Sequence, residues 1–488
     1  MKKLRRLLFR ILLIGLSVMA AIFAFNTYTF PSKQIKVEPV SPMEIGDAVI
    51  ERLAAAVRIP TLSYEDHIDT AAFLDLDTFL WQSYPLVDSI LQRETVNGFS
   101  FILKWQGQNS RLAPILLLGH MDVVGIENGG EGWSEQPFAG IQKDGYLWGR
   151  GTLDDKLAVC GLLEAVELLL SVDYAPQRTV YLAFGHDEEV GGEHGAASIA
   201  AIFKRRNIEF DFILDEGSLV VEHALPGCEP PVALIGLTEK GYVTIGLTAN
   251  VESGGHSSMP GRASAINILS ESIVALRDHP SPAKIEGSVK AMFEHIGPEM
   301  NLFNKIIFAN IGWTKSLLIK QMSASPSSDA MLRTTIAPTI MSSGFKDNVI
   351  PTQAQAQVNC RILPGESVET TLAYIRSVVD ERVTVSLGEN SQATEPAPIS
   401  GTGTFGYSIL QTTAREIFPD AIVAPSLVVA TTDARHYIDV SENIYRFVPI
   451  KVARPQVGGI HGINEKINVE EYKNTIRFYR QLILNACK

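Results

Sequence analysis

The sequence predicts an α/β protein in which a mostly parallel sheet, flanked by helices, is interrupted by a smaller α+β domain. Residues 115–118, 179–184 and 212–214 are short apolar runs that end abruptly in glycine or acidic residues, as buried strands do. Residues 157–170 lie between two of these runs and have helical length and spacing. Such an alternation is typical of parallel sheets, which gather ligands at the carboxyl ends of their strands.

From residue 240 the pattern changes to that of a second, antiparallel domain. Residues 242–250 and 353–362 alternate apolar and polar positions, as half-buried strands do, and residues 263–277 have helical spacing. After Pro364 follow another amphipathic helix, strand-like segments and a C-terminal helix. The predicted boundaries are a first domain in two pieces, residues 43–239 and 363–488, and an inserted domain over residues 240–362.

Length and charge exclude several classes of protein. The chain has 488 residues, of which 46% are hydrophobic and 20% charged, which fits a globular protein of about two domains. Five of its 42 basic residues lie among the first ten, which leaves 37 against 54 acids, a net charge of −17 beyond them. Without a basic stripe in that part, nucleic acid is excluded as a partner. The four cysteines are too far apart to indicate a zinc knuckle or a disulfide scaffold.

The N-terminus predicts a signal anchor or a signal peptide over residues 1–28. Residues 7–25 are apolar except for Arg10, a length between the 7 to 15 residues typical of a cleaved signal and the about 20 of a spanning helix. Asn26 makes a poor cleavage site, which favours an uncleaved anchor over a signal peptide, and a buried core helix is the other alternative. The basic flank should stay in the cytoplasm, so the rest would be periplasmic, extracellular or lumenal, or secreted after cleavage. Residues 29–42 then form a polar tether.

The first candidate site residues follow residues 115–118. His120 and Asp122 are two positions apart, so both side chains point to the same side of an extended chain. One can bind a metal while the other orients it, because a zinc-bound imidazole commonly donates its second N–H to a carboxylate. Asp154 and Asp155 come next, directly before the helix expected from residue 157. Taken alone, these two acids also fit an ordinary helix cap.

More acids follow the next two strands. His186, Asp187, Glu188 and Glu189 are four consecutive ionisable residues, which must be either solvated, as in an exposed acidic loop, or neutralised by cations. Asp215 and Glu216 follow residues 212–214, and His461 lies near the C-terminus. Two histidines and several acids at strand ends suit two zinc ions that share a carboxylate and activate a water. The sequence therefore predicts a hydrolase.

These motifs, taken in order, resemble a known family. They read Gly-His-Met-Asp-Val-Val from residue 119, Gly-Arg-Gly-x-x-Asp-Asp-Lys from 149, Asp-Glu-Glu-Val-Gly-Gly from 187, Leu-Asp-Glu-Gly from 214, Gly-Gly-His-Ser-Ser-x-Pro from 254, Asn-Val-Ile-Pro from 348 and a late His461. The chain resembles the dinuclear-zinc family of aminoacylase, glutamate carboxypeptidase and carnosinase, and within it the branch of yeast vacuolar carboxypeptidase S. The resemblance covers residues 43–488.

The resemblance implies a role for each metal-site residue. Two zinc ions per subunit would be held by His120, Asp155, Glu189, Asp215 and His461. Asp155 is taken as the bridging acid because the family's bridging acid directly precedes the lysine, and Glu216 is a rival to Asp215. Glu188 would be the general base, and Asp122 would orient His120.

The resemblance also implies substrate contacts and a homodimer. In the family, the counterpart of His256 reaches into the partner subunit's active site and stabilises the oxyanion, while Asn348 and Arg361 match residues that contact substrate. The guanidinium of Arg361 suits a free carboxylate, although a surface salt bridge is the alternative. Residues 240–362 would then be a lid and dimerisation domain.

The expected function is that of a membrane-tethered zinc hydrolase that cleaves an amide bond next to a free carboxylate. As a carboxypeptidase or dipeptidase it would act on small peptides. The alternative is an N-acyl-amino-acid hydrolase of the aminoacylase type, which could also run in the synthetic direction. A catalytically dead binding protein should have lost ligands or Glu188, and none is lost. An aminopeptidase should lack the segments that carry His256 and Arg361.

Overall fold

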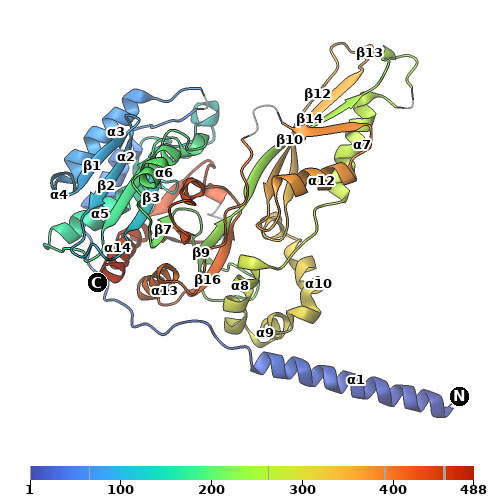
Figure 1. Ribbon diagram of the computed structural model, residues 1–488, viewed down its shortest axis with the longest axis horizontal. Coiled ribbons are helices and arrows are strands. Elements are labelled where there is room, and N and C mark those ends of the chain that lie inside the picture. Colours follow the sequence, from blue (N-terminus) through green and yellow to red (C-terminus); the bar gives the residue numbers. More distant parts are fainter. Residues whose placement is uncertain (1, 65, 262, 389–391, 454–457) are drawn as a thin grey trace.

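The computed structural model describes residues 2–64, 66–261, 263–388, 392–453 and 458–488. Figure 1 shows a large domain of sheet and helices, a second domain of strands and helices beside it, and one long helix that projects from the body. The predicted α/β architecture, with a large sheet flanked by helices and a smaller domain inserted, is confirmed.

A ten-stranded mixed sheet forms the centre of the large domain. Along the sheet the strands are β1 (Gln92–Val96), β2 (Ser100–Trp105), β6 (Val180–Gly185), β3 (Ile115–His120), β7 (Phe212–Asp215), β17 (Ile444–Arg446), β9 (Val232–Glu239), β8 (Val220–Glu222) and β18 (Lys451–Ala453), with β16 (Ile422–Val428) paired to β9. The strands β6, β3, β7 and β17 are parallel neighbours. Their carboxyl ends therefore meet at one edge, and acidic motifs follow β3, β6 and β7 at that edge.

Helices cover both faces of this sheet. They are α2 (Ala48–Val57), α3 (Thr70–Ser83), α4 (Pro85–Ile90), α5 (Lys156–Leu170), α6 (Ala196–Arg205), α13 (Phe405–Ile417) and α14 (Val469–Ala486). Asn468 caps the start of α14, because its Oδ1 accepts hydrogen bonds from the backbone N–H groups of Glu470 and Glu471 at 2.9 and 3.4 Å. Nearly all of α5 is buried, because it packs between the sheet and α14.

Short strands and single helical turns complete the large domain. A three-stranded sheet joins β19 (Lys466–Asn468), β5 (Tyr146–Trp148) and β4 (Ile141–Lys143). The 3₁₀ turns are η1 (Glu127–Gly130), η2 (Glu188–Val190), η3 (Gly297–Glu299) and η4 (Asp433–Tyr437). Of these, η2 carries the acidic motif that follows β6, and η4 carries Asp433, Arg435 and His436 after β16.

The second domain is an antiparallel sheet with two helices. Its strands run in the order β12 (Thr335–Ser343), β14 (Gln353–Ile362), β10 (Gly241–Asn250) and β15 (Val383–Leu387), and its helices are α7 (Ala265–Asp278) and α12 (Val368–Val378). A separate ribbon joins β11 (Gly255–His256) to β13 (Val349–Ile350). The second sheet thus ends at residue 387 and not at the predicted boundary of 362, because β15 pairs with the free edge of β10.

Part of the predicted inserted domain belongs to the large domain instead. Helices α8 (Gly287–Ile296), α9 (Leu302–Ala309), α10 (Ile311–Met322) and α11 (Pro326–Ala330) lie between α7 and β12 in sequence. Apolar residues of α8, α9 and α10 form one core with Val232 of β9 and Ile422 of β16. These helices therefore cover the edge of the large sheet, as Figure 1 shows.

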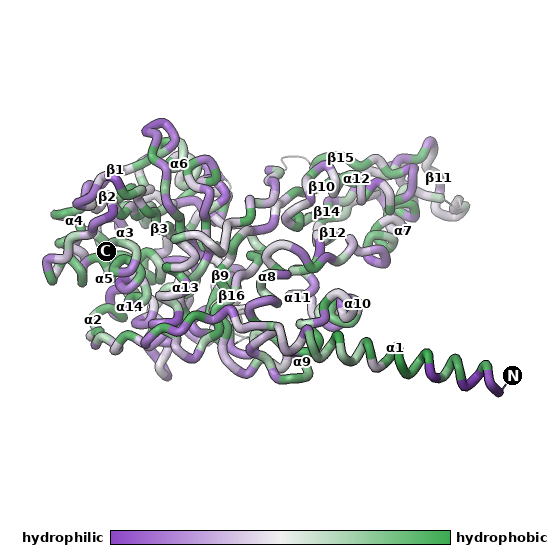
Figure 2. Tube along the Cα trace, turned by 60° about the horizontal axis from the view of Figure 1, so that its bottom comes forward, coloured by the Kyte–Doolittle hydropathy of each residue, from purple (hydrophilic) through white to green (hydrophobic). Residues whose placement is uncertain are grey.

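The N-terminal helix α1 (Lys2–Tyr28) is long and apolar enough to cross a membrane, and among the described residues it is the one helix that meets this test. In Figure 2 it extends away from the body as a largely hydrophobic rod. The segment after it runs along the large domain, where Gln34 Nε2 donates to Val423 O at 3.0 Å and Gln34 Oε1 accepts from Val423 N at 2.8 Å. The predicted tether is thus bound to strand β16.

Candidate active site

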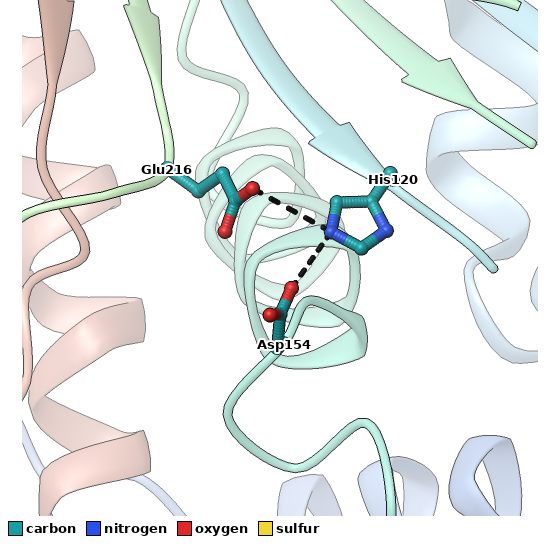
Figure 3. A group of neighbouring side chains, drawn as sticks. All are labelled: His120, Asp154 and Glu216. Atoms are coloured by element: carbon teal, nitrogen blue, oxygen red, sulfur yellow. Dashed lines mark hydrogen bonds and ion pairs between the residues drawn. The ribbon is translucent and has the colours of Figure 1, made fainter. Parts of the chain in front are cut away.

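Two groups of side chains meet at the carboxyl edge of the large sheet. In the first, His120 Nε2 lies 2.8 Å from Asp154 Oδ1 and 3.7 Å from Glu216 Oε1 (Figure 3). In the second, His461 Nε2 lies 3.1 Å from both Asp154 Oδ2 and Glu189 Oε2. Within each group the potential ligand atoms all lie within 4.8 Å of one another. Asp154 belongs to both groups and presents one oxygen to each.

The chemistry of these groups fits two divalent cations. Burial, together with neighbouring carboxylates, raises the pKa of Glu216 well above its usual value, and burial also raises the pKa of Glu189. Hydrogen bonds to Asp154 and Glu189 raise the pKa of His461 to about 10. The buried Oε1 of Glu189 has no hydrogen-bond partner within the described chain. Imidazole nitrogens and carboxylate oxygens that converge in this way are the donors of co-catalytic zinc sites.

Asp122 supports both the histidine and the acidic loop. Its side chain is fully buried, and Oδ1 lies 3.3 Å from His120 Nδ1. The two carboxylate oxygens also accept hydrogen bonds from the backbone N–H groups of Glu188 at 3.1 Å and Glu189 at 3.0 Å. Asp122 therefore fixes the orientation of His120 and the position of the η2 turn at the same time.

Glu188 belongs to neither group of potential ligands. Burial raises the pKa of its carboxyl group well above the usual value, and so do the neighbouring charges of Asp433, Glu189 and Asp154. A raised pKa suits a carboxyl group that accepts a proton and later releases it near neutral pH. Glu188 therefore has the environment of a general base beside two metal positions.

A family model described as Peptidase family M20/M25/M40 matches residues 116–485, which is most of the chain. The chain belongs to this family. Its members include metallo-carboxypeptidases. Two predictions from the motifs are thus confirmed, the resemblance to this family and the assignment of the chain as a metallo-hydrolase.

Several relatives match this M20 chain over nearly its whole length. It is 39% identical to "Probable carboxypeptidase S-like 2" of Dictyostelium discoideum, over 99% of this chain and 94% of that protein. It is 37% identical to "N-fatty-acyl-amino acid synthase/hydrolase PM20D1" of Xenopus tropicalis, over 97% of this chain and 94% of that protein. Carboxypeptidase S of Saccharomyces cerevisiae is 28% identical, over 92% of this chain and 88% of the yeast protein.

Solved structures share the fold. An M20 family metallo-carboxypeptidase from Sulfolobus solfataricus superposes with a TM-score of 0.66 at 15% identity, over 90% of this chain and 99% of that one. Human carnosine dipeptidase 1 superposes with a TM-score of 0.63 at 14% identity, over 96% of this chain and 99% of that one. At such low identity these matches establish the architecture of the M20 chain and not its substrate.

Two of the predicted metal ligands lie outside the metal groups. Asp155 is fully buried, and its Oδ2 accepts a hydrogen bond from the backbone N–H of His120 at 3.3 Å. Asp215 is also buried, and its Oδ2 accepts from the backbone N–H of Ala434 at 2.7 Å. Asp154 and Glu216 take their places, because neighbouring side chains at a strand end or a helix start point in different directions.

One predicted substrate residue of the second domain lies at the junction with the large domain. Arg361, on β14, is half-buried, lies over the ring of Tyr242 with its guanidinium carbon 4.8 Å from the ring centroid, and donates from Nη1 to Thr431 Oγ1 at 3.4 Å. The charge of Glu188 acts on Arg361, and burial lowers the pKa of its guanidinium. Arg361 therefore lies at the junction between the domains, within electrostatic range of Glu188.

His256 and Asn348 lie far from the metal groups of their own chain. His256 is exposed on β11, its Nδ1 lies 2.8 Å from Ser258 Oγ, and Ser257 N donates to Asn348 O at 3.1 Å. Figure 1 places the adjoining strand β13 at the outer end of the second domain, away from α5 and β3. One chain alone thus does not complete the predicted set of substrate contacts.

Sequence reasoning missed a buried network that holds the η4 turn. Glu239 Oε2 accepts hydrogen bonds from Thr432 N at 3.0 Å, from Thr432 Oγ1 at 2.9 Å and from Arg446 Nε at 2.9 Å. From the same turn, the side chains of Arg435 and His436 donate to Gly191 O at 2.6 and 3.0 Å. No spacing in the sequence links residues 431–436 to Glu239 or Arg446.

Proposed function

We propose that this M20 chain is a zinc-dependent hydrolase that cleaves an amide bond next to a free carboxylate, with small peptides as substrates. The observation that carries the proposal is the sharing of Asp154 by two donor groups, with Glu188 beside them. The ligands in this proposal are His120, Glu216, Asp154, Glu189 and His461. When bound, the two zinc ions would lower the pKa of a water molecule and polarise the scissile carbonyl.

Three further residues of the chain have separate roles in the proposed reaction. Glu188 takes a proton from the attacking water and delivers it to the leaving nitrogen. General acid–base catalysis of this kind raises the reaction rate by about 10²- to 10⁴-fold. Arg361 pairs with the carboxylate of the substrate, because a guanidinium binds a carboxylate through two parallel hydrogen bonds. Asp122 holds His120 and the η2 turn in place.

A homodimer would complete the site. His256 and Asn348 lie at the outer end of the second domain, where they can meet the metal site of a second copy and not their own. A donor aimed at the developing oxyanion is worth about 3 to 4 kcal/mol of barrier. The proposal also includes anchoring by α1, with the catalytic part outside the cytoplasm.

The second candidate is hydrolysis or synthesis of N-acyl amino acids. It is favoured by the 37% identity to the Xenopus tropicalis protein named as an N-fatty-acyl-amino acid synthase/hydrolase. Both candidate substrates contain an amide bond next to a free carboxylate. They differ in the group on the acyl side of that bond, which is an amino acid in a peptide and an acyl chain in an N-acyl amino acid. Turnover of a dipeptide and of an N-acyl amino acid with the same C-terminal residue distinguishes them directly.

The decisive experiment combines metal analysis with one substitution. Purified full-length protein is expected to contain near two zinc ions per chain, and Glu188→Gln should retain them while its turnover falls about 10²- to 10⁴-fold. Glu193→Gln, at an exposed acid in the same loop, is the matched control and should keep full turnover. A chain without bound metal, or a Glu188→Gln variant with full turnover, would refute the mechanism.

A further inference from the structure

The end of helix α1 is fixed to the helices α9 and α10. Asn310, which joins α9 to α10, is 2% exposed, and its Nδ2 donates to Phe23 O at 3.3 Å and to Thr27 Oγ1 at 3.5 Å. Asn26 Nδ2 in turn donates to Asn310 Oδ1 at 2.9 Å. A polar cluster of this kind fixes where the apolar helix meets the body.

Helix α9 lies beside the apolar part of α1. A groove of about 860 Å³ runs between the two helices, lined by Leu16, Met19 and Phe23 of α1 and by Leu302 and Ile306 of α9. Leu16 to Phe23 belong to the uncharged, mostly apolar stretch that a membrane anchor would place in the bilayer. A membrane crossed by α1 therefore reaches α9 as well.

Helices α9 and α10 carry four large apolar side chains that are exposed. Leu302 is 69% exposed, Phe303 71%, Trp313 69% and Leu317 54%. The same two helices also have buried apolar side chains, since Phe308, Leu318 and Met322 belong to the core that α8 shares with the large sheet. Water-exposed apolar groups of this size mark an interaction surface, and tryptophan is characteristic of membrane interfaces.

The charge of this segment also differs from that of the rest of the chain. Residues 300–328 contain no Asp or Glu, although the whole chain has 54 acids among 488 residues. The same stretch carries Lys305, Lys315 and Lys320, which gives it a net charge of +3 in a protein of net charge −12. Lysines at the edge of an apolar surface suit the phosphates of lipid headgroups.

We propose that Leu302, Phe303, Trp313 and Leu317 form a docking face that inserts into the bilayer beside α1. The occupant is the lipid surface, and the result is a fixed orientation of the catalytic domain on the membrane. The proposal rests on the proposed anchoring by α1, and it goes beyond that anchoring because a tethered domain could equally stand clear of the bilayer.

The tryptophans of the chain provide the test. The protein has five, and Trp81, Trp105, Trp133 and Trp148 all lie in the large domain, away from the docking face. Full-length protein is reconstituted into phosphatidylcholine vesicles with a minority of phosphatidylglycerol, with and without bromine on the acyl chains. Brominated lipid is expected to quench the fluorescence of the wild-type protein, and the quenching should be lost in Trp313→Phe. Equal quenching in both proteins, or none in either, overturns the proposal.

Two further measurements separate the alternatives. The double variant Phe303→Glu, Leu317→Glu should lose the quenching of Trp313, while Val172→Glu, at a site 64% exposed on the large domain, should retain it. Carbonate-resistant sedimentation with the vesicles reports the anchoring by α1 independently. A chain that stays anchored while Trp313 is not quenched refutes the docking face alone. A dimer in detergent that the double variant dissociates would assign the face to a second copy and refute the lipid assignment.

Discussion

Replacing Asp122 with asparagine should weaken metal binding and catalysis through two separate contacts. The carboxylate lies 3.3 Å from His120 Nδ1, and its two oxygens accept the backbone N–H groups of Glu188 and Glu189. Asparagine at this position would keep the volume of the side chain but replace one accepting oxygen with an NH2 group, which donates and cannot accept a hydrogen bond. The substitution should therefore disturb both the histidine and the turn that carries Glu188, the proposed general base.

The size of each effect follows from these contacts. Loss of one charge-assisted hydrogen bond at this fully buried position should lower the free energy of unfolding by about 1.5 to 3 kcal/mol. Loss of the carboxylate behind a ligating imidazole typically costs about 10- to 100-fold in metal affinity. Because Glu188 moves with its backbone, turnover should stay low even when enough zinc is supplied to fill the site.

The assay is a zinc titration against a competing chelator, followed by turnover at saturating zinc. The matched control is Glu167→Gln, because the Glu167 carboxylate also accepts two backbone N–H groups, from Leu86 at 3.0 Å and Val87 at 2.9 Å, far from the metal site. The control should lose stability and keep zinc affinity and turnover. Equal zinc affinity in the two variants, or full turnover of Asp122→Asn at saturating zinc, would refute the reasoning.

Three further predictions follow from single side chains. Asp154→Asn should lose bound metal from both positions, as read by metal analysis after dialysis, whereas Asp155→Asn should keep two ions per chain. Glu216→Gln should lose one ion, and Asp215→Asn should keep both but melt at a lower temperature, because its carboxylate holds the η4 turn. Burial lowers the pKa of Lys240 from 10.5 to about 7. At a pH between these two values, Lys240 is therefore protonated in the unfolded chain and neutral in the folded chain. The free energy of unfolding should therefore rise with pH over that window, by up to roughly 1.4 kcal/mol per pH unit, and urea titrations of Lys240→Met should lack this rise.

The elements that build the metal site could be predicted because each is defined locally. The run 115–118 is wholly apolar and corresponds to β3, and the run 179–184 corresponds to β6, both within one residue or two of the observed bounds. Buried parallel strands are continuous apolar segments, so the sequence alone shows where they end and where ligands must follow. The edge of the sheet that carries the site was thus predictable.

The boundaries of the second domain were not predictable, because they depend on pairing between distant segments. Residues 383–387 form a strand only by pairing with β10, more than 130 residues earlier in the chain. Helices α8 to α10 have apolar faces that could cover either sheet, and the choice of the large one is made by contacts with β9 and β16. A periodic pattern shows that a helix has a buried face but does not show which surface buries it.

Adjacent acids explain why two ligands expected from the sequence differ from the members of the metal groups. In the pair Asp154 and Asp155, and again in Asp215 and Glu216, one carboxylate joins a metal group while its neighbour accepts a backbone N–H. The two roles depend on each other, since a ligand keeps its place only if the backbone that carries it is fixed. A sequence shows that two acids lie side by side, but the direction of each side chain depends on backbone angles that are set by the surrounding fold. Asp155 and Asp215 are therefore positioning residues in this proposal, and their substitution should affect stability before metal content.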